Sequence, residues 1–209
     1  MLSKRTQLVW VAFFFAIPCA LFILQAGSDT IQSSVLLTSL ASVDERPDSD
    51  PIFETITSSS PSWNSIVIHH LGQPAGDIET IDRDHRDAGL NGFGYHFLIG
   101  NGNGLANGAV QMGYRWIKQA QGAKPAHIRS QDWKNGVISI CLIGNGNRRP
   151  FTDTQILHLS HLVQRLQQEL SIPASHIVLA SDFGDSPSPG IYFAEAQFRS
   201  LLLDIPGTN

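Results

Sequence analysis

The chain has 209 residues, of which 42% are hydrophobic and 15% charged, and its formal net charge is −4. This composition supplies enough apolar side chains for one compact domain with an appendage. A slightly acidic chain without clustered Lys and Arg lacks the positive surface that binds nucleic acid, so we expect no nucleic-acid partner. The two cysteines, Cys19 and Cys141, lie in separate apolar runs, and we expect both to be free thiols.

The first 27 residues have the features of an export signal. Lys4 and Arg5 precede an uninterrupted apolar run from Leu8 to Leu24, which would be about 25 Å long as a helix. Bulky Leu24 stands where signal peptidase needs a small residue, so we favour an uncleaved signal anchor over a cleaved signal peptide. Either form places the rest of the chain on the extracytoplasmic side, in the periplasm or cell envelope, and the domain would be secreted if the segment were cleaved.

Residues 28–61 are predicted to be a linker, because they are rich in Ser, Thr, Asp and Pro and show no sustained period. Residues 62–205 are predicted to form one α/β domain in which strands and helices alternate. Its strand candidates are apolar along most of their length, as in a sheet covered on both faces, and comprise residues 65–70, 94–100, 137–143 and 177–180.

The strongest helix prediction covers residues 153–170. Thr152 and Gln155 have the spacing of a capping box, and apolar residues then recur at helical intervals. Weaker helices are predicted at 78–88 and 192–203.

Histidines and glycines at the strand ends are the first candidates for chemistry. His69 and His70 end the first strand, and because adjacent strand residues point to opposite faces, only one of them can serve a given site. A histidine there, taken alone, is more often a core or rim residue than a metal ligand. The glycine-rich stretch at 100–104 lacks the Lys-Ser/Thr and the helix of a phosphate loop, so we interpret it as a turn.

Several fragments in order carry a family resemblance. They are Ile-Val-Ile-His-His at 66–70, Gly-Tyr-His-Phe-Leu-Ile-Gly at 94–100, Ile-Ser-Ile-Cys-Leu-Ile-Gly-Asn at 138–145 and a late Pro-Gly at 189–190. With the Thr-capped helix, they resemble the zinc-dependent N-acetylmuramoyl-L-alanine amidase type 2 family, which includes the peptidoglycan recognition proteins and the amidase-type phage lysozymes. His85-Arg86 and Pro125-Ala126-His127 add to the resemblance, which covers about Trp63 to Leu203. It implies a single mixed central sheet flanked by helices, here preceded by the N-terminal hydrophobic helix.

The resemblance also implies a zinc site. In the family the first His of the Ile-His-His stretch, here His69, binds zinc, and the Tyr of Gly-Tyr-His-Phe, here Tyr95, assists catalysis. The other two ligands come from a late Gly-His-x-Asp segment and from a Cys eight residues after that His. Aligning Ser188-Pro189-Gly190 on the family's Cys-Pro-Gly puts Ala180 at the second His and Ser188 at the Cys.

This alignment leaves His69 as the only metal ligand. Alanine has no donor atom, and a serine hydroxyl is a poor zinc ligand beside a thiolate. Asp182 falls on the family's Asp, and Ser186, at another catalytic position, could donate a hydrogen bond but not replace a cation. We therefore expect no cofactor, or zinc if the domain is active.

Other residues could rebuild a metal site. A replacement set of His69, His127 and Asp185 is conceivable, whereas His96 follows Tyr95 in a strand and should point to the opposite face. Asp182 has a simpler interpretation as a loop residue that bonds its own backbone. Tyr95 and His127 can likewise be groove-lining side chains.

Three functional hypotheses follow. The leading one is an extracytoplasmic amidase-like domain, held to the membrane by its N-terminal helix, that binds peptidoglycan fragments across His69, Tyr95, His127 and Ser186 but has lost zinc and hydrolysis. The second is an active amidase that cleaves the lactyl-amide bond between muramic acid and L-alanine. The third is a scaffold that binds another envelope protein.

Overall fold

The computed structural model describes residues 52–54, 62–123, 135–184 and 186–205. The predicted N-terminal hydrophobic helix, most of the predicted linker, His127 and Asp185 lie outside the described residues. The chain divides into two units, Met1–Ser49 and Asp50–Asn209, and the fold below is that of the second. None of the helices in the described ranges is long and apolar enough to cross a membrane.

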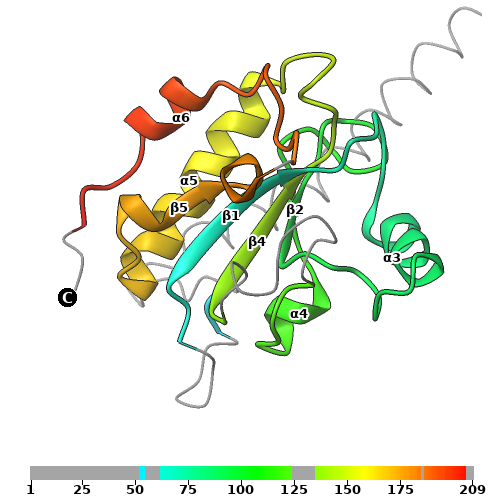
Figure 1. Cartoon of the computed structure of the whole chain (residues 1–209), viewed down its shortest axis with the longest axis horizontal. Coiled ribbons are helices and arrows are strands. Elements are labelled where there is room, and N and C mark those ends of the chain that lie inside the picture. Colours follow the sequence, from blue (N-terminus) through cyan, green and yellow to red (C-terminus); the bar gives the residue numbers. More distant parts are fainter. Residues whose placement is uncertain (1–51, 55–61, 124–134, 185, 206–209) are drawn as a thin grey trace, which may run out of the picture. The chain divides into compact units, whose positions relative to one another are not determined.

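A five-stranded sheet with the order β3-β2-β4-β1-β5 forms the centre of the second unit (Figure 1). Its strands are β1 (Ser65–His70), β2 (Phe97–Ile99), β3 (Val110–Met112), β4 (Val137–Leu142) and β5 (Ile177–Leu179). The pairs β1–β4, β1–β5 and β2–β4 are parallel, and β2–β3 is antiparallel. The prediction of a single mixed sheet is therefore confirmed.

The helices flank this sheet, with α5 and α6 on one side and α3 on the other (Figure 1). They are α3 (Ile78–Asp87), α4 (Tyr114–Ile117), α5 (Asp153–Leu170) and α6 (Glu195–Ser200), with two short 3-10 helices, η1 (Ala174–His176) and η2 (Ala180–Phe183). The capping box before α5 forms as predicted. Thr152 Oγ1 accepts from the Gln155 N–H at 3.1 Å, and Gln155 Oε1 accepts from the Thr152 N–H at 3.2 Å.

Both faces of the sheet are covered by apolar side chains. Because successive strand residues point to opposite faces, Ile138, Ile140 and Leu142 of β4 join the cluster under α5, while Cys141 joins the cluster that includes Ile81 of α3. Each fully buried Leu or Ile contributes about 1.5–3 kcal/mol. This double burial explains why the strand segments are apolar along most of their length.

Residues of the predicted linker also pack on the domain. Ile52 and Phe53 are partly buried against the cluster under α5. The Trp116 Nε1–H donates to the Ile52 carbonyl at 2.6 Å, and the Arg165 guanidinium lies 5.6 Å from the Phe53 ring. Contacts with the core thus begin before residue 62.

Candidate functional site

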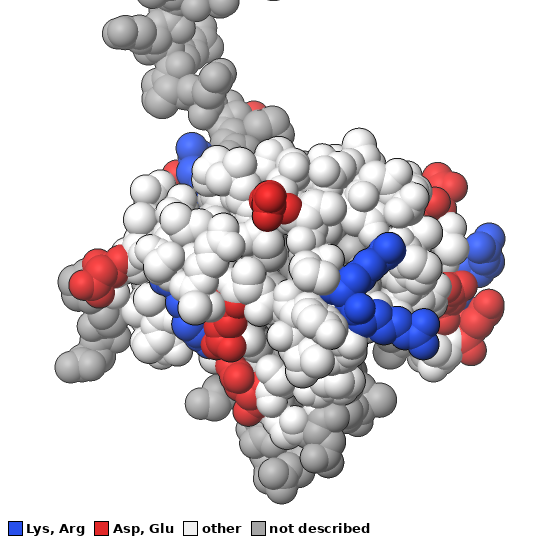
Figure 2. Space-filling model, turned by 90° about the horizontal axis from the view of Figure 1, so that it is seen from above, with Lys and Arg blue, Asp and Glu red and all other residues white. Residues whose placement is uncertain are grey.

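The parallel strands β1, β2, β4 and β5 all end at one edge of the sheet, which is where α/β folds commonly place their ligands. The molecule seen from above, in Figure 2, presents this end, and most of its surface there is uncharged. The candidate site lies at this edge, where β1 ends.

His69 and Tyr95 lie against each other at the end of β1. His69 is 3% exposed and pairs in register with Cys141 of β4. Its ring centroid is 5.4 Å from that of Tyr95, whose hydroxyl is hydrogen-bonded to the Cys141 thiol. Burial raises the pKa of Tyr95 well above its ordinary value, and burial also raises that of Cys141. Tyr95 is therefore a neutral phenol at neutral pH, able to donate a hydrogen bond.

His85 belongs to the same site, although sequence reasoning did not assign it a role. Its ring centroid is 5.5 Å from that of Tyr95, and its Nδ1 accepts from the Gly94 N–H at 3.0 Å. Burial lowers the pKa of His85, against the opposing effect of Asp84 and Asp82. Helical spacing could have pointed to His85, because it lies four residues after the buried Ile81 and so is on the same face of α3.

A small pocket separates α3 from this end of the sheet. It has a volume of about 110 Å³ and is lined by the Tyr95 and His85 side chains together with Gln73, Thr80 and Asp84. Gln73 belongs to the segment 71–76, which follows β1 and forms one wall of the pocket. The pocket combines an aromatic ring with several polar groups, and it is smaller than the roughly 300–1,000 Å³ of small-molecule sites.

Ala180 follows directly after β5. The register of β1 and β5 pairs Val67 with Val178 and Ile68 with Leu179, and Ala180 then begins the 3-10 helix η2. Ala180 is fully buried and clusters with Val67 and Val137, with Val178 and Phe183 packed against them. An apolar methyl group therefore lies on the face of the sheet that Val67 shares with His69.

Ser188 also reaches the end of β1. Its Oγ accepts from the His70 N–H at 2.7 Å, and its own N–H donates to Ser186 Oγ at 3.3 Å. Asp182 Oδ2 accepts from the Leu179 N–H at 2.9 Å, which confirms the expectation that Asp182 bonds nearby backbone. Ser188 thus bonds the end of β1, and Asp182 bonds the end of β5.

These residues do not fit a zinc ion. The described part of the chain contains no group of three His, Cys, Asp or Glu side chains that could hold a metal. Ala180 offers only a methyl group, and the Ser188 oxygen already serves the backbone of β1. The replacement set of His69, His127 and Asp185 includes two residues outside the described ranges.

His96 is separated from the site, as strand alternation predicts. It is fully buried between Trp63 and Trp116, with ring centroids 5.0 Å and 6.2 Å away. Its Nδ1 accepts from the Ser139 N–H at 2.9 Å, so Nε2 carries the proton and donates to the Ala120 carbonyl at 3.0 Å. Burial lowers the pKa of His96 to about 4. His96 is therefore a neutral, structural residue.

His70 joins two loops at the rim of the site. Its Nδ1 accepts from the Gly146 N–H at 3.1 Å, and its ring is also hydrogen-bonded to the backbone of Pro189. Burial lowers the pKa of His70. Gly146 must be glycine here, since a Cβ would lie 2.0 Å from the Pro189 carbonyl oxygen.

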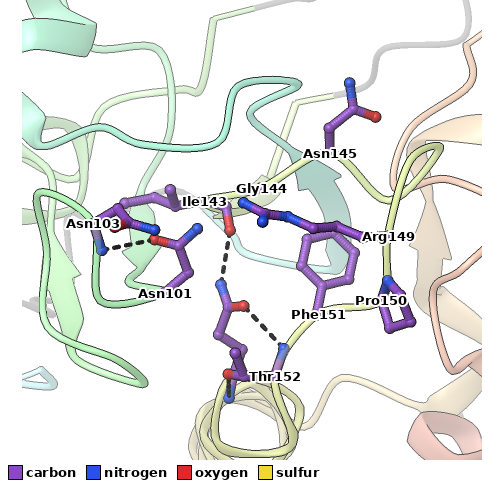
Figure 3. Close-up of a pocket in the computed structure, with 10 residues that line it drawn as sticks. Asn101, Asn103, Ile143, Gly144, Asn145, Arg149, Pro150, Phe151 and Thr152 are labelled. Atoms are coloured by element: carbon purple, nitrogen blue, oxygen red, sulfur yellow. Dashed lines mark hydrogen bonds between the residues drawn. The ribbon is translucent and has the colours of Figure 1, made fainter.

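Asparagines fix the segment 71–76. Asn145 Nδ2 donates to the Gly72 carbonyl at 3.0 Å, and Asn101 Nδ2 donates to the Pro74 carbonyl at 2.9 Å. The glycine-rich stretch is a turn, as expected, with the Gly102 N–H bonded to the Leu105 carbonyl. Asn101 and Asn103 of this stretch line a pocket of about 170 Å³ together with Arg149 and Phe151 (Figure 3).

The fold is shared with peptidoglycan recognition proteins and N-acetylmuramoyl-L-alanine amidases of solved structure. The amidase LysC from Clostridium intestinale URNW has a TM-score of 0.50 at 22% identity, covering 66% of this chain and 85% of LysC. Bumblebee PGRP-SA has a TM-score of 0.53 at 20% identity, covering 71% of this chain and 89% of its own. The complex of the recognition proteins LCa and LCx bound to tracheal cytotoxin gives a TM-score of 0.51 at 20% identity. The match covers 65% of this chain and 81% of the matched chain in that complex.

The particular family follows from the sequence. The pattern of the Amidase_2 family, N-acetylmuramoyl-L-alanine amidase, matches residues 59–190, and the chain belongs to this family. Among curated proteins, none matches the chain. The predicted family is therefore confirmed.

Proposed function

We propose that this domain binds muropeptide, the sugar-linked stem peptide of peptidoglycan, at the end of β1 without zinc and without hydrolysing it. The observation that carries the proposal is the contrast at His69. On one side Tyr95 and His85 form a packed wall beside a pocket. On the other side is the buried methyl group of Ala180, the residue that the family resemblance aligns with a zinc ligand.

Binding and hydrolysis make different demands on such a site. Recognition needs shape, apolar contact and a few well-placed polar groups, which Tyr95, His85 and the pocket beside them offer. Metal-dependent amide hydrolysis needs a cation that activates water and polarises the carbonyl. A neutral phenol at Tyr95 can donate one hydrogen bond but cannot supply that charge.

The ligand class is supported by the family and by one structural relative. The family is described by its amidase activity on N-acetylmuramoyl-L-alanine, a peptidoglycan linkage. The relative formed by the recognition proteins LCa and LCx is a complex with tracheal cytotoxin. We place muropeptide across His69, Tyr95 and His85, with His127 and Ser186 as further contacts.

We also propose that the domain works on the extracytoplasmic side, held by the hydrophobic segment 1–27. Lys4 and Arg5 ahead of the apolar run support this orientation. The ligand and the location agree, because peptidoglycan lies outside the cytoplasmic membrane.

The proposal is tested by sedimenting the full chain with insoluble peptidoglycan and assaying for release of stem peptide. We expect retention without release, and retention weakened about tenfold by Tyr95→Ala through loss of aromatic contact area. Tyr114→Ala, in α4, is the matched control and should retain the wild-type affinity. Absence of retention would favour the envelope scaffold, and release of stem peptide would establish an active amidase.

A further inference from the structure

A second cavity lies at the same end of the sheet, beyond the 186–190 loop. It has a volume of about 370 Å³, within the roughly 300–1,000 Å³ of small-molecule sites. Leu179 at the end of β5, Ser181 of η2 and Glu195 of α6 contribute to its walls, together with Asn147, Ser186, Pro187, Pro189, Gly190, Ile191 and Phe193. Since Ser186 and Pro189 belong to the loop that closes the candidate site at Ser188, the two sites share one wall.

The polar groups of this cavity can both donate and accept hydrogen bonds. Asn147 Nδ2 donates to the Pro187 carbonyl at 3.1 Å, which leaves its Oδ1 as an acceptor. Ser186 Oγ accepts from the Ser188 N–H, which leaves its O–H as a donor. Glu195 is paired with Arg199 at 2.6 Å, so the cavity carries little net charge. Such a lining suits a neutral ligand rich in hydroxyl and amide groups.

Ile191 lines the cavity, and Tyr192 follows it on the same loop. Ile191 is 80% exposed and Tyr192 is 49% exposed, although both are large hydrophobic residues. The backbone beneath them is fixed, because the Tyr192 N–H donates to the Gly146 carbonyl at 2.8 Å. Exposed apolar side chains on a rigid loop, next to a mixed polar cavity, commonly mark a binding surface.

We infer that this cavity and the side chains of Ile191 and Tyr192 form a subsite for the sugar rings of a glycan strand. A hexopyranose offers apolar C–H faces to side chains such as these, and its hydroxyl and acetamido groups match the donors and acceptors of Asn147 and Ser186. The inference rests on the proposed function, because the glycan would run from the muropeptide site across the 186–190 loop. It adds that the domain contacts sugar rings of the glycan beyond the one that carries the stem peptide.

The test compares two muropeptides with the same stem peptide, one with two sugars and one with four, in titrations of the full chain. We expect the four-sugar ligand to bind about tenfold more tightly, the gain of one more occupied ring subsite. Ile191→Ser should remove most of that gain and leave the two-sugar affinity unchanged. Ile117→Ser replaces the same residue type at a 53% exposed position in α4 and should keep the gain.

A peptide-free chain of four N-acetylglucosamine units, titrated in parallel, separates the two ways to fail. Equal affinity for both muropeptides, or equal effects of the two isoleucine variants, overturns the glycan subsite and leaves muropeptide binding intact. If neither muropeptide binds while the sugar chain binds in an Ile191-dependent manner, the subsite stands and the proposed stem-peptide site falls. If none of the three probes binds, both are wrong.

Discussion

The two halves of the candidate site differ in the side chains that they present. The half built by β1, α3 and the approach to β2 keeps His69, Tyr95 and His85 in ring contact beside a pocket. The half built by β5 and the 186–190 loop keeps its position in the fold, but Ala180 is packed among aliphatic side chains and Ser188 bonds the backbone of β1. The first half thus offers imidazole and phenol groups, whereas the second offers a methyl group and a serine hydroxyl that is bonded to backbone.

The largest effect is expected when zinc-binding side chains are introduced at Ala180 and Ser188, in the half built by β5 and the 186–190 loop. The wild-type chain, dialysed against micromolar zinc, should hold well under one equivalent by elemental analysis. Ala180→His combined with Ser188→Cys should raise zinc affinity by at least about a thousandfold, because three-ligand zinc sites are stabilised by many kcal/mol. Ser188→Cys alone is the matched control and should stay substoichiometric. Stoichiometric zinc in the wild type, lost in His69→Ala, would refute the contrast between the halves.

The next largest effect is a loss of stability at low pH that is caused by the structural histidine, His96. The pKa of His96 is about 4 in the fold against about 6.5 when unfolded, so the unfolded chain binds more protons between these values. The contribution of His96 to the free energy of unfolding is fully present above about pH 6.5. It should fall by about 3 kcal/mol as the pH drops towards about 4, at about 1.4 kcal/mol per pH unit.

Urea unfolding of the full chain at pH 7.5, 5.5 and 4 measures this loss. His96→Gln lowers stability at pH 7.5 but should flatten the decline attributable to this residue. His176→Gln, at an exposed position, is the control and should keep the wild-type decline. An unchanged decline in His96→Gln would mean that other groups cause it.

A smaller effect is expected from the retained wall. His85→Ala should weaken binding of a soluble muropeptide about five- to tenfold, because it removes one face of the pocket beside Tyr95. His161→Ala, on the exposed part of α5, should bind as the wild type does. Equal affinities of the two variants in calorimetric titrations would show that ligand does not use the α3 side.

The smallest effect concerns the loop half. Ser188→Ala removes the acceptor of the His70 N–H and should cost about 1 kcal/mol of unfolding free energy. Ser181→Ala, at an exposed position, should change stability by less than about 0.5 kcal/mol. A neutral Ser188→Ala variant would mean that the serine is retained for the ligand and not for the loop.

Much of the fold was predictable because its strong elements are long and buried. The apolar runs gave β1, β4 and β5, and the capping box with its apolar stripe gave α5. β3 and α4 have only three and four residues, too short to show a period. The predicted strand at 94–100 is ladder-paired only over 97–99, because the Ser139 N–H of β4 donates to the His96 ring and not to a backbone carbonyl.

The site was predictable where spacing in the sequence reflects position in the sheet. The family's spacing predicts that His69 and Ala180 are neighbours, and the β1–β5 pairing ends one residue before both, with Ile68 opposite Leu179. His85 was missed because its role depends on how α3 packs against Tyr95, and the cavity beside Ile191 was missed because its walls come from four separate segments. Such tertiary contacts leave little trace in a single sequence.

The central claim is that this domain binds muropeptide without a metal. The most direct measurement is the dissociation constant of the full chain for a soluble muropeptide, determined with EDTA and again with saturating zinc, while the ligand is followed by mass spectrometry. We predict the same constant in both conditions and an intact ligand. Loss of binding in EDTA, or zinc-dependent cleavage between the muramic acid and L-alanine, would contradict it.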